Sequence, residues 1–460
     1  MDDSAIRPRT IHVLASGRFF SRTRDDGGRC GDIEPAISTL IRRDAEAVLH
    51  TLLAEEPALL IEGPRGSGKS TIMRQIARTR SAHVIDLDDD GVASVVREDP
   101  EFALAQDGLV VIDEFQRAPA VLSAIKRAVD ARPSPGRFLL AGSVSASLLP
   151  TGSETLTGRV HRLVLPPLGA GELLRAPTRL IPAVLAGNAV PATHSELTRA
   201  DYFQLVAAGG YPAALRRSGS AARRRWFASY LASVAERDIP QLADVRHPGV
   251  LPRLYRLVAE QTSDIIARST IAQRLGLSTT TTAAYLDLLR HVHLLRELPS
   301  WTIGVSSKVG RRPKMHVVDT GLALASLGLD GRRLAGSALA GGFLESYVMA
   351  EVAQQAGLID EPVSLVHFRD RSGVEVDLVL ERSDGSVIGV EVKSATSVNQ
   401  TDGKGLRFLR DRLGDRFTMG LVLYTGQLTA RLGDRVWATP VSALWGGSGF
   451  AESGGTDAPA

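Results

Sequence analysis

The sequence predicts an α/β protein with a parallel sheet in its N-terminal part. Apolar runs at 58–61, 109–112 and 138–141 are separated by segments in which apolar residues recur at helical spacing. Runs of this length are typical of strands buried on both faces of a parallel sheet. A glycine-rich segment that ends in lysine and serine follows the first run. Alternating strands and helices of this kind predict an open α/β sheet.

Length and composition restrict the remaining possibilities. The chain has 460 residues, which suggests about three domains, and its 44% hydrophobic and 23% charged residues exclude a disordered or fibrous protein. A net charge of +3 excludes a wholly basic nucleic-acid coat. The single cysteine, Cys30, excludes an internal disulfide or a thiolate zinc cluster. Without a run of ~18 apolar residues or the apolar core of a secretory signal, we expect a cytoplasmic protein with no membrane partner.

The other elements follow from local patterns. Helical spacing over 37–53 predicts a helix before the first strand, and 195–296 is mostly helical with breaks at 209–210 and 247–249. Strand patterns return after 298, and a helix from Gly341 leads to strands at 364–368, 374–380 and 387–392. Asp384-Gly385 between the last two predicts a hairpin. We therefore expect a flexible extension over 1–31, domains over 32–175, 176–335 and 336–445, and a flexible tail over 446–460.

The most specific pattern in the chain is a phosphate-binding loop. The segment Gly63-Pro64-Arg65-Gly66-Ser67-Gly68-Lys69-Ser70 fits G-x-x-x-x-G-K-[ST] and lies between a predicted strand and a predicted helix. In such a loop backbone N–H groups converge on phosphate oxygens, the lysine neutralises the β and γ phosphates, and the serine can ligate Mg²⁺. The alternative is a glycine-rich turn with a chance lysine. We expect the following residues to bind ATP: Gly63, Pro64, Arg65, Gly66, Ser67, Gly68, Lys69, Ser70 and Thr71.

Polar side chains follow the next two apolar runs. Asp113 and Glu114 end the second run, at the edge of the sheet where open α/β folds bind ligands. Asp113 would hold Mg²⁺ together with Ser70, and Glu114 would orient and deprotonate an attacking water. Ser143, after the third run, would contact the γ-phosphate or that water, and Arg159 would act as an arginine finger, in cis or toward a neighbouring subunit. The alternatives are a solvated strand end for the acidic pair and a surface arginine for Arg159.

These segments together resemble the P-loop, Walker B and sensor strands of AAA-type ATPases. The segments Arg43-Asp44-Ala45-Glu46 and Gly209-Gly210-Tyr211-Pro212 further resemble the archaeal and bacterial branch related to STAND ATPases. In that branch the two segments flank the adenine, so the resemblance implies that Arg43 and Pro212 contact the nucleotide. From its residues alone, Gly-Gly-Tyr-Pro indicates only a turn.

The middle of the chain has the pattern of a helix-turn-helix. Helices over 251–259, 270–275 and 279–289 are predicted, with Gly276-Leu277-Ser278 as the turn before the last. The pattern resembles a winged helix, whose recognition helix can enter the major groove of DNA. Lys308, Arg311, Arg312 and Lys314 would form a wing or a strip that contacts phosphates. The alternative is that this module serves as a lid or as a subunit contact.

Carboxylates and a lysine gather in the C-terminal strands. Asp377 lies on one hairpin strand, Glu391-Val392-Lys393 on the next, and Glu345 on the preceding helix. This arrangement resembles the restriction-endonuclease-like PD-(D/E)XK superfamily. The resemblance implies that Asp377, Glu391 and Glu345 bind Mg²⁺ and that Lys393 positions or activates water for phosphodiester cleavage. The alternatives are an ion-paired hairpin and a retained fold without cleavage.

The order of the three parts also resembles one large family of AAA-type ATPases with a C-terminal region of unknown function. It implies an AAA-type domain over 32–175, a helical and winged-helix domain over 176–335 and a nuclease-like domain over 336–445. The leading hypothesis is an ATP-hydrolysing DNA-processing protein, a DNA-binding motor or remodeller with a Mg²⁺-dependent nuclease-like C-terminal domain, whose partner is DNA in branched or single-stranded form. The alternative is a STAND-type regulatory switch with a catalytically silent nuclease-like domain. Self-association, up to a hexameric ring, is implied only by the resemblance.

Overall fold

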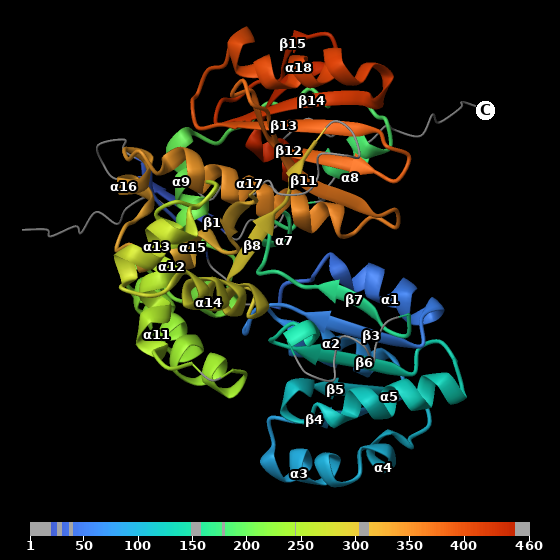
Figure 1. Ribbon diagram of the computed structural model, residues 1–460. Coiled ribbons are helices and arrows are strands. Elements are labelled where there is room, and N and C mark those ends of the chain that lie inside the picture. Colours follow the sequence, from blue (N-terminus) through green and yellow to red (C-terminus); the bar gives the residue numbers. More distant parts are fainter. Residues whose placement is uncertain are drawn as a thin grey trace, which may run out of the picture.

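The computed structural model describes residues 40–148, 158–176, 180–243, 245–302 and 312–446, and the backbone of two short strands at 20–24 and 30–35. Three parts follow one another along the chain (Figure 1). The N-terminal part, in blue and cyan, and the C-terminal part, in orange and red, each contain a large sheet. The helices of the middle part, in green and yellow, lie beside both.

The N-terminal part is built on a five-stranded parallel sheet, which confirms the predicted α/β class for this region. Its strand order is β4-β5-β6-β3-β7. The three predicted apolar runs are its central strands, and they are buried along their whole length. The strand bounds are β3 (Ala58–Glu62), β4 (Ala82–Asp86), β5 (Leu109–Asp113), β6 (Phe138–Gly142) and β7 (His161–Val164).

Helices cover both faces of this sheet because successive strand residues point to opposite sides. Helices α1 (Ala45–Glu55) and α2 (Lys69–Thr79) pack on the face that carries Leu59 and Ile61. Helices α3 (Asp90–Glu98), α4 (Pro100–Leu104) and α5 (Ala120–Ala131) pack on the face that carries Leu60. The phosphate-loop segment therefore joins a central strand to a helix that packs on the same sheet.

Two predictions for the start of the chain need correction. The helix predicted over 37–53 begins only at Ala45, because residues 40–43 are not helical and the Asp44 N–H is bonded to the Glu172 carboxylate instead. Part of the extension predicted to be flexible forms a two-stranded antiparallel sheet of β1 (Phe20–Arg24) and β2 (Cys30–Pro35). Such a ladder is held by backbone groups and requires no apolar periodicity.

The middle part is mostly helical, as predicted. Predicted helices at 251–259, 270–275 and 279–289 appear as α12 (Leu251–Ala259), α13 (Arg268–Leu275) and α14 (Thr279–His291). An antiparallel pair of strands, β8 (Leu295–Leu298) and β10 (Lys314–Val317), follows. The other helices are α7 (Ala170–Leu173), α8 (Leu180–Leu185), α9 (Arg199–Ala208), α10 (Pro212–Leu215), α11 (Ser220–Ser233), α15 (Thr320–Ser326) and α16 (Gly331–Ala335).

The C-terminal part is a seven-stranded mixed sheet with the order β15-β16-β14-β13-β12-β11-β9. Helix α17 (Ala340–Ala356) packs on one face and α18 (Lys404–Leu413) on the other. The predicted Asp384-Gly385 hairpin is confirmed, because β12 and β13 pair antiparallel with Leu378 opposite Val390. The strand bounds are β9 (Ser300–Trp301), β11 (Val363–Arg369), β12 (Glu375–Arg382), β13 (Val387–Lys393), β14 (Phe417–Tyr424), β15 (Ala430–Gly433) and β16 (Val436–Pro440).

Within the described ranges, the helices are all too short or too polar to cross a lipid bilayer. The predicted tail lies outside these ranges from residue 447 onward.

Candidate functional site

The phosphate loop has the geometry of an anion cradle. Gly66 and Gly68 have φ angles of 78° and 105°, which residues with a Cβ atom rarely adopt. The Lys69 ammonium folds back over the loop and donates to the carbonyl oxygens of Gly63 at 2.8 Å and Pro64 at 3.1 Å. The Ser67 hydroxyl is buried without a hydrogen-bond partner in the described part of the chain. The loop therefore offers an unused hydroxyl donor to a phosphate chain, which fits ATP.

Burial changes the ionisation of Lys69. It lowers the pKa of the ammonium to about 8, and the nearby Glu114 and Asp113 carboxylates oppose this effect only in part. An ammonium removed from water is destabilised unless an anion compensates it. Phosphate oxygens would provide that compensation, so ATP binding should raise the pKa of Lys69 again.

Asp113 and Ser70 meet beside the loop. Burial raises the pKa of Asp113, whereas a hydrogen bond from Ser70 lowers it. A carboxylate and a hydroxyl at one position are the oxygen ligands that Mg²⁺ takes in phosphate sites, with waters and phosphate oxygens completing the shell. The predicted metal role of these two residues is thus compatible with the structure.

Glu114 is held by a pair of polar side chains. It adopts a left-handed conformation with φ 54°, and its Oε2 accepts hydrogen bonds from Ser143 Oγ at 3.2 Å and from Gln116 Nε2. Gln116 Nε2 also donates to Ser143 Oγ at 3.0 Å. The structure thus brings the predicted Glu114 and Ser143 together. Gln116 was not predicted, and its place two residues after Glu114 is the only signal in the sequence.

Arg43 supports the loop from behind. Its guanidinium donates to Ser67 O at 2.6 Å, to Pro166 O at 2.8 Å and to the Glu172 carboxylate at 2.8 Å. Side-chain exposure is 5% for Arg43 and 0% for Glu172. These bonds engage each nitrogen of the guanidinium with protein oxygens, so the structure places Arg43 as a brace of the loop backbone. The predicted contact with the nucleotide remains a prediction.

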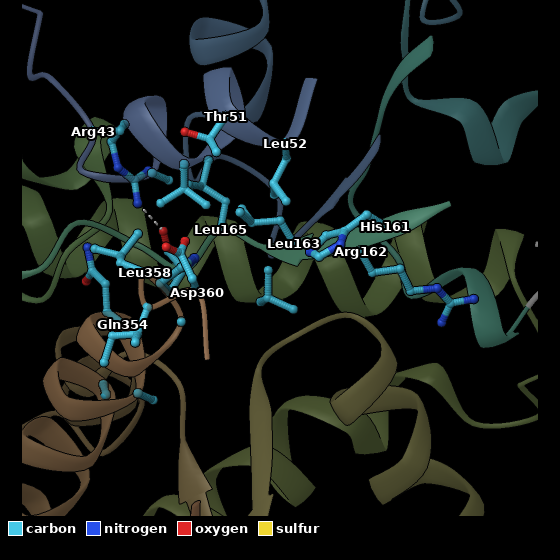
Figure 2. Close-up of a pocket in the computed structure, with 18 of the residues that line it drawn as sticks. Arg43, Thr51, Leu52, His161, Arg162, Leu163, Leu165, Gln354, Leu358 and Asp360 are labelled. Carbon is cyan, nitrogen blue, oxygen red and sulfur yellow. Dashed lines mark hydrogen bonds between the residues drawn. The ribbon is translucent and has the colours of Figure 1, made fainter. Parts of the chain in front are cut away.

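Beside Arg43, a cavity of about 640 Å³ lies between α1, β7 and the end of α17 (Figure 2). Leu52 and Leu163 line its apolar wall, and Gln354 and Asp360 line it from the C-terminal part. None of residues 63–71 lines this cavity, so it is separate from the phosphate cradle.

The tip of the loop touches the middle part of the chain. Arg65 forms an ion pair with Asp238 at 2.9 Å, and its carbonyl accepts a hydrogen bond from the Tyr230 hydroxyl at 3.0 Å. Tyr230 in turn meets the Tyr211 hydroxyl at 3.1 Å, and Pro212 follows as the first residue of α10. The predicted Gly-Gly-Tyr-Pro turn therefore reaches the phosphate loop through two tyrosines.

A second contact with the middle part lies at the end of α14. Ser145, just after β6, donates its N–H to the His291 carbonyl at 2.9 Å. Burial lowers the pKa of the nearby His293 to about 3, and the charge of Lys69 adds to this effect. His293 is therefore neutral at physiological pH and close to the phosphate loop.

Arg159 lies far from the phosphate loop within its own chain. It precedes β7, which runs parallel to β3 with Leu59 opposite His161, whereas the loop follows the other end of β3. Its Nε forms an ion pair with Asp130 at 2.5 Å. A role for Arg159 in cis is therefore wrong, because parallel strands place it at the opposite edge of the sheet. A role in trans remains a prediction.

The predicted basic strip is only partly described. Lys308 and Arg311 lie outside the described residues, and Arg312 is exposed. Lys314, however, has a side-chain exposure of only 4% and points into the C-terminal part. The expectation that it contacts DNA phosphates is wrong, because three carboxylates surround its ammonium.

The predicted C-terminal residues come together in space. Lys314 Nζ lies 2.9 Å from Glu345 Oε1 and 3.3 Å from Asp377 Oδ1. Glu391 pairs with Lys393 at 2.9 Å. Burial and the charge of Asp377 raise the pKa of Glu345 and of Glu391 to about 8.

As they stand, these side chains do not fit Mg²⁺. In the described ranges no three His, Cys, Asp or Glu side chains are arranged to hold a metal ion. The ammonium groups of Lys314 and Lys393 instead pair with these carboxyl groups.

Three family models match consecutive stretches of the chain. Residues 55–174 match an AAA domain, and residues 199–333 and 340–444 match two domains of unknown function, DUF8612 and DUF4143. The N-terminal part is therefore similar to an AAA domain, and its loop between β3 and α2 has the motif of a P-loop. The loop geometry and this match agree on the same residues.

Two curated proteins are similar over most of the chain. They are the uncharacterized proteins Rv2008c of Mycobacterium tuberculosis and Mb2031c of Mycobacterium bovis. Each is 29% identical over 407 residues, which cover 88% of this chain and 84% of the relative.

Solved structures show only a loose likeness. The Walker-type ATPase PABY2304 of Pyrococcus abyssi has 16% identity and a TM-score of 0.39, covering 64% of this chain and 98% of that chain. AMPPCP-bound DnaA from Aquifex aeolicus has 13% identity and a TM-score of 0.27, covering 55% and 91%. Likenesses at these scores carry no functional meaning by themselves.

Proposed function

We propose that this protein is an ATP-hydrolysing switch whose nucleotide state acts on the C-terminal part through the middle part. The observation that carries the proposal is the direct contact of the phosphate loop with the middle part at Arg65, Tyr230 and Asp238. A loop that changes when it binds or loses phosphate must change these contacts too. In this proposal the C-terminal part, for which the sequence resemblance implies a nuclease-like fold, binds a partner and does not cleave it.

For hydrolysis, each residue of the loop has a defined task. Lys69 would leave the Gly63 and Pro64 carbonyls and pair with the β and γ phosphates, and Ser70 and Asp113 would be the residues that hold Mg²⁺, whose charge would offset that of the phosphates. Glu114 accepts a proton from water as the water oxygen bonds to the γ-phosphorus and the bond to the β-phosphate oxygen breaks. Ser143 and Gln116 keep the Glu114 carboxylate in place. The products are ADP and phosphate.

Coupling to the C-terminal part has a physical route through β10. The Tyr211 turn is held by Asp319, whose carboxylate accepts the Gly210 N–H at 2.7 Å. Asp319 lies just beyond the end of β10, and β10 begins with Lys314. A shift at Arg65 can therefore reach the C-terminal carboxylates along one short strand.

A second route runs through Arg43. The Glu172 carboxylate that pairs with Arg43 lies in α7, and the Ala170 N–H of the same helix donates to Glu351 of α17 at 2.7 Å. Burial raises the pKa of Glu351 to about 8. Helix α17 also carries Glu345, so both routes end at the same cluster of carboxylates.

The test is steady-state ATP hydrolysis. We expect the wild type to release phosphate, Lys69→Ala to lose this activity, and Lys126→Ala, which removes a partly exposed lysine of α5, to keep it. Phosphate release by Lys69→Ala at the wild-type rate would reject the proposed site.

DNA processing is the second candidate, and a specific surface favours it. The first residues of α14, Thr279 and Thr280, are exposed after the Ser278 cap, as a recognition helix requires. A cavity of about 360 Å³ in the C-terminal part is lined by Lys393 and Lys404 together with four carboxylates, those of Glu375, Asp377, Glu391 and Asp402. Its two lysines suit contacts with phosphate oxygens, whereas the carboxylates that outnumber them oppose a phosphodiester backbone.

A panel of duplex, single-stranded and branched DNA separates the two candidates. A DNA-processing protein hydrolyses ATP faster with at least one of these DNAs, and a switch that acts on another partner shows the same rate with all of them.

A further inference from the structure

We propose that the Lys314 ammonium is the built-in cation of the C-terminal carboxylate cluster, formed by Glu345, Glu375 and Asp377, and that it excludes a divalent metal ion. This goes beyond the proposed function and does not depend on ATP turnover. The cluster is the place where the sequence predicts Mg²⁺, and the structure puts a protein side chain there.

The geometry of Lys314 is that of a bound cation. Its Nζ lies 2.9 Å from Glu345 Oε1, 2.6 Å from Glu375 Oε1 and 3.3 Å from Asp377 Oδ1. An ammonium has three N–H donors, so each donor has one carboxylate. A divalent ion would have to lie at about 2.0–2.6 Å from oxygens of the same set. Lys314 and a metal ion therefore cannot occupy the centre together.

Two further oxygens of the predicted metal set are also engaged. Asp377 Oδ2 accepts the Val392 N–H at 2.9 Å, and Glu391 Oε2 accepts a hydrogen bond from Lys393 at 2.9 Å. A metal ion would thus have to break several bonds besides those of Lys314.

Charge explains why a lysine is stable at this position. Burial alone would lower the pKa of Lys314, but the charges of Asp377, Glu345 and Glu375 raise it above its usual value. The group therefore stays charged at every physiological pH. Two imidazoles near it, those of His316 and His367, have pKa values lowered by burial and by the Lys314 charge, and they remain neutral.

Lys314 and the carboxylates come from different parts of the chain. Lys314 begins β10 of the middle part, Glu345 belongs to α17, and Glu375 and Asp377 belong to β12. The middle part thus supplies the cation for a C-terminal cluster, and the cluster is free for a metal ion only when this side chain is absent or displaced.

Binding of Mn²⁺ to the full-length protein, followed by electron paramagnetic resonance without nucleotide, tests the inference. The variants are Lys314→Met, the double variant Lys314→Met/Asp377→Asn, and Lys126→Met as a control for losing a lysine elsewhere. We expect Lys314→Met to bind one more Mn²⁺ per chain than the wild type, and we expect the double variant to lose that ion. Lys126→Met should bind as the wild type does.

Thermal unfolding with and without Mg²⁺ provides a second readout. Without Mg²⁺ the Lys314→Met variant should unfold at a lower temperature than the wild type, because like charges remain buried without a cation. Mg²⁺ should raise the unfolding temperature of this variant and leave that of the wild type unchanged.

Two results would overturn the inference. One is a Mn²⁺ ion bound by the wild type and lost in the single variant Asp377→Asn, which needs no change at Lys314. The other is a folded Lys314→Met protein that gains no ion. If Lys314→Met does not fold, Lys314→Gln replaces it, and the comparison of the wild type with Asp377→Asn still decides the question.

Discussion

Arg43 joins the phosphate loop to helix α7 through a buried ion pair with Glu172. Arg43 and Glu172 are 129 residues apart in the chain, and both are buried. No local pattern marks such a pair, because each partner alone is an ordinary charged residue. The loop motif, by contrast, was predicted from its sequence, since glycine spacing and a terminal lysine express the phosphate chemistry directly. The contact of Gln116 with Glu114 was missed as well, because a glutamine two residues after a glutamate is not a pattern that marks a site.

Removal of Arg43 should destabilise the protein. In Arg43→Ala the Glu172 carboxylate stays buried without its partner, so the free energy of unfolding should fall by about 3–5 kcal/mol. Urea unfolding followed by circular dichroism measures this change. Arg42→Ala is the matched control, because the side chain of Arg42, the residue next to Arg43, is 82% exposed. Equal stabilities for the two variants would show that the brace contributes nothing.

Lys69 should give ATP binding a pH dependence. In the protein without nucleotide, burial lowers the pKa of Lys69 to about 8, so above this pH the empty loop holds a neutral amine. Phosphates favour the charged form, so ATP binding above pH 8 must take up a proton, and the affinity falls as the pH rises. Calorimetric titrations in buffers of different ionisation enthalpy measure that uptake. The arginine of Lys69→Arg stays charged at every pH of the experiment, so this variant should bind ATP without taking up a proton. An equal proton uptake by this variant would assign the proton to another group.

The elements that sequence patterns predicted are those buried on both faces or strongly periodic. Strands β3, β5 and β6 are continuous apolar runs, and Asp384-Gly385 predicts the hairpin of β12 and β13. Strands β4 and β7 were not predicted, because each lies at an edge and exposes much of its length. The C-terminal strands β14 and β16, which pair in parallel, were missed as well, since their partners are remote in sequence.

The contact between the turn at Gly210 and Asp319, which are 109 residues apart in the chain, should behave as one joint between elements. The Asp319 carboxylate accepts the N–H groups of Gly210 and Leu322, each at 2.7 Å, and it is fully buried. In Asp319→Ala these donors lose their acceptor, which costs about 1–3 kcal/mol for each. Unfolding in urea measures the loss. Asp330→Ala, which removes the side-chain cap of α16, serves as the control. An equal loss of unfolding free energy in both variants would show that the contact at Asp319 has no special role.

The same carboxylate predicts how stability varies with pH. Burial raises the pKa of Asp319 to about 6, from a usual value of 3.8. Between these values the folded state holds more protons than the unfolded state, so this group's contribution to stability falls as the pH rises. In Asp319→Asn the free energy of unfolding should lose this part of its dependence on pH.

At the scale of the whole molecule, the predicted role of Arg159 as an arginine finger in trans implies cooperation between chains. It lies at the sheet edge opposite the phosphate loop, so it can reach a nucleotide only in another copy. Arg159→Ala and Lys69→Ala should each be inactive alone. A mixture should recover ATP hydrolysis, because mixed assemblies contain an intact loop next to an intact arginine. Full activity of Arg159→Ala alone would remove this residue from the site.

The three parts are joined by contacts that the sequence could not show. Domain order and the residues of both predicted sites followed from motifs, but the position of Lys314 did not. In the sequence it belongs to a basic strip, whereas in the structure its surroundings are three carboxylates from another part of the chain. The long-range position of a charged residue is set by the packing of domains, which no local pattern encodes.

Hydrogen exchange of β10 and α17 in the ATP-bound and nucleotide-free protein tests most directly whether the loop acts on the C-terminal part. We expect ATP to change the exchange of backbone amides in both elements in the wild type, and Lys69→Ala to show no change under the same conditions. If ATP binds to the wild type and alters exchange only around residues 63–71, the loop does not communicate with the C-terminal part, and the proposed switch is wrong.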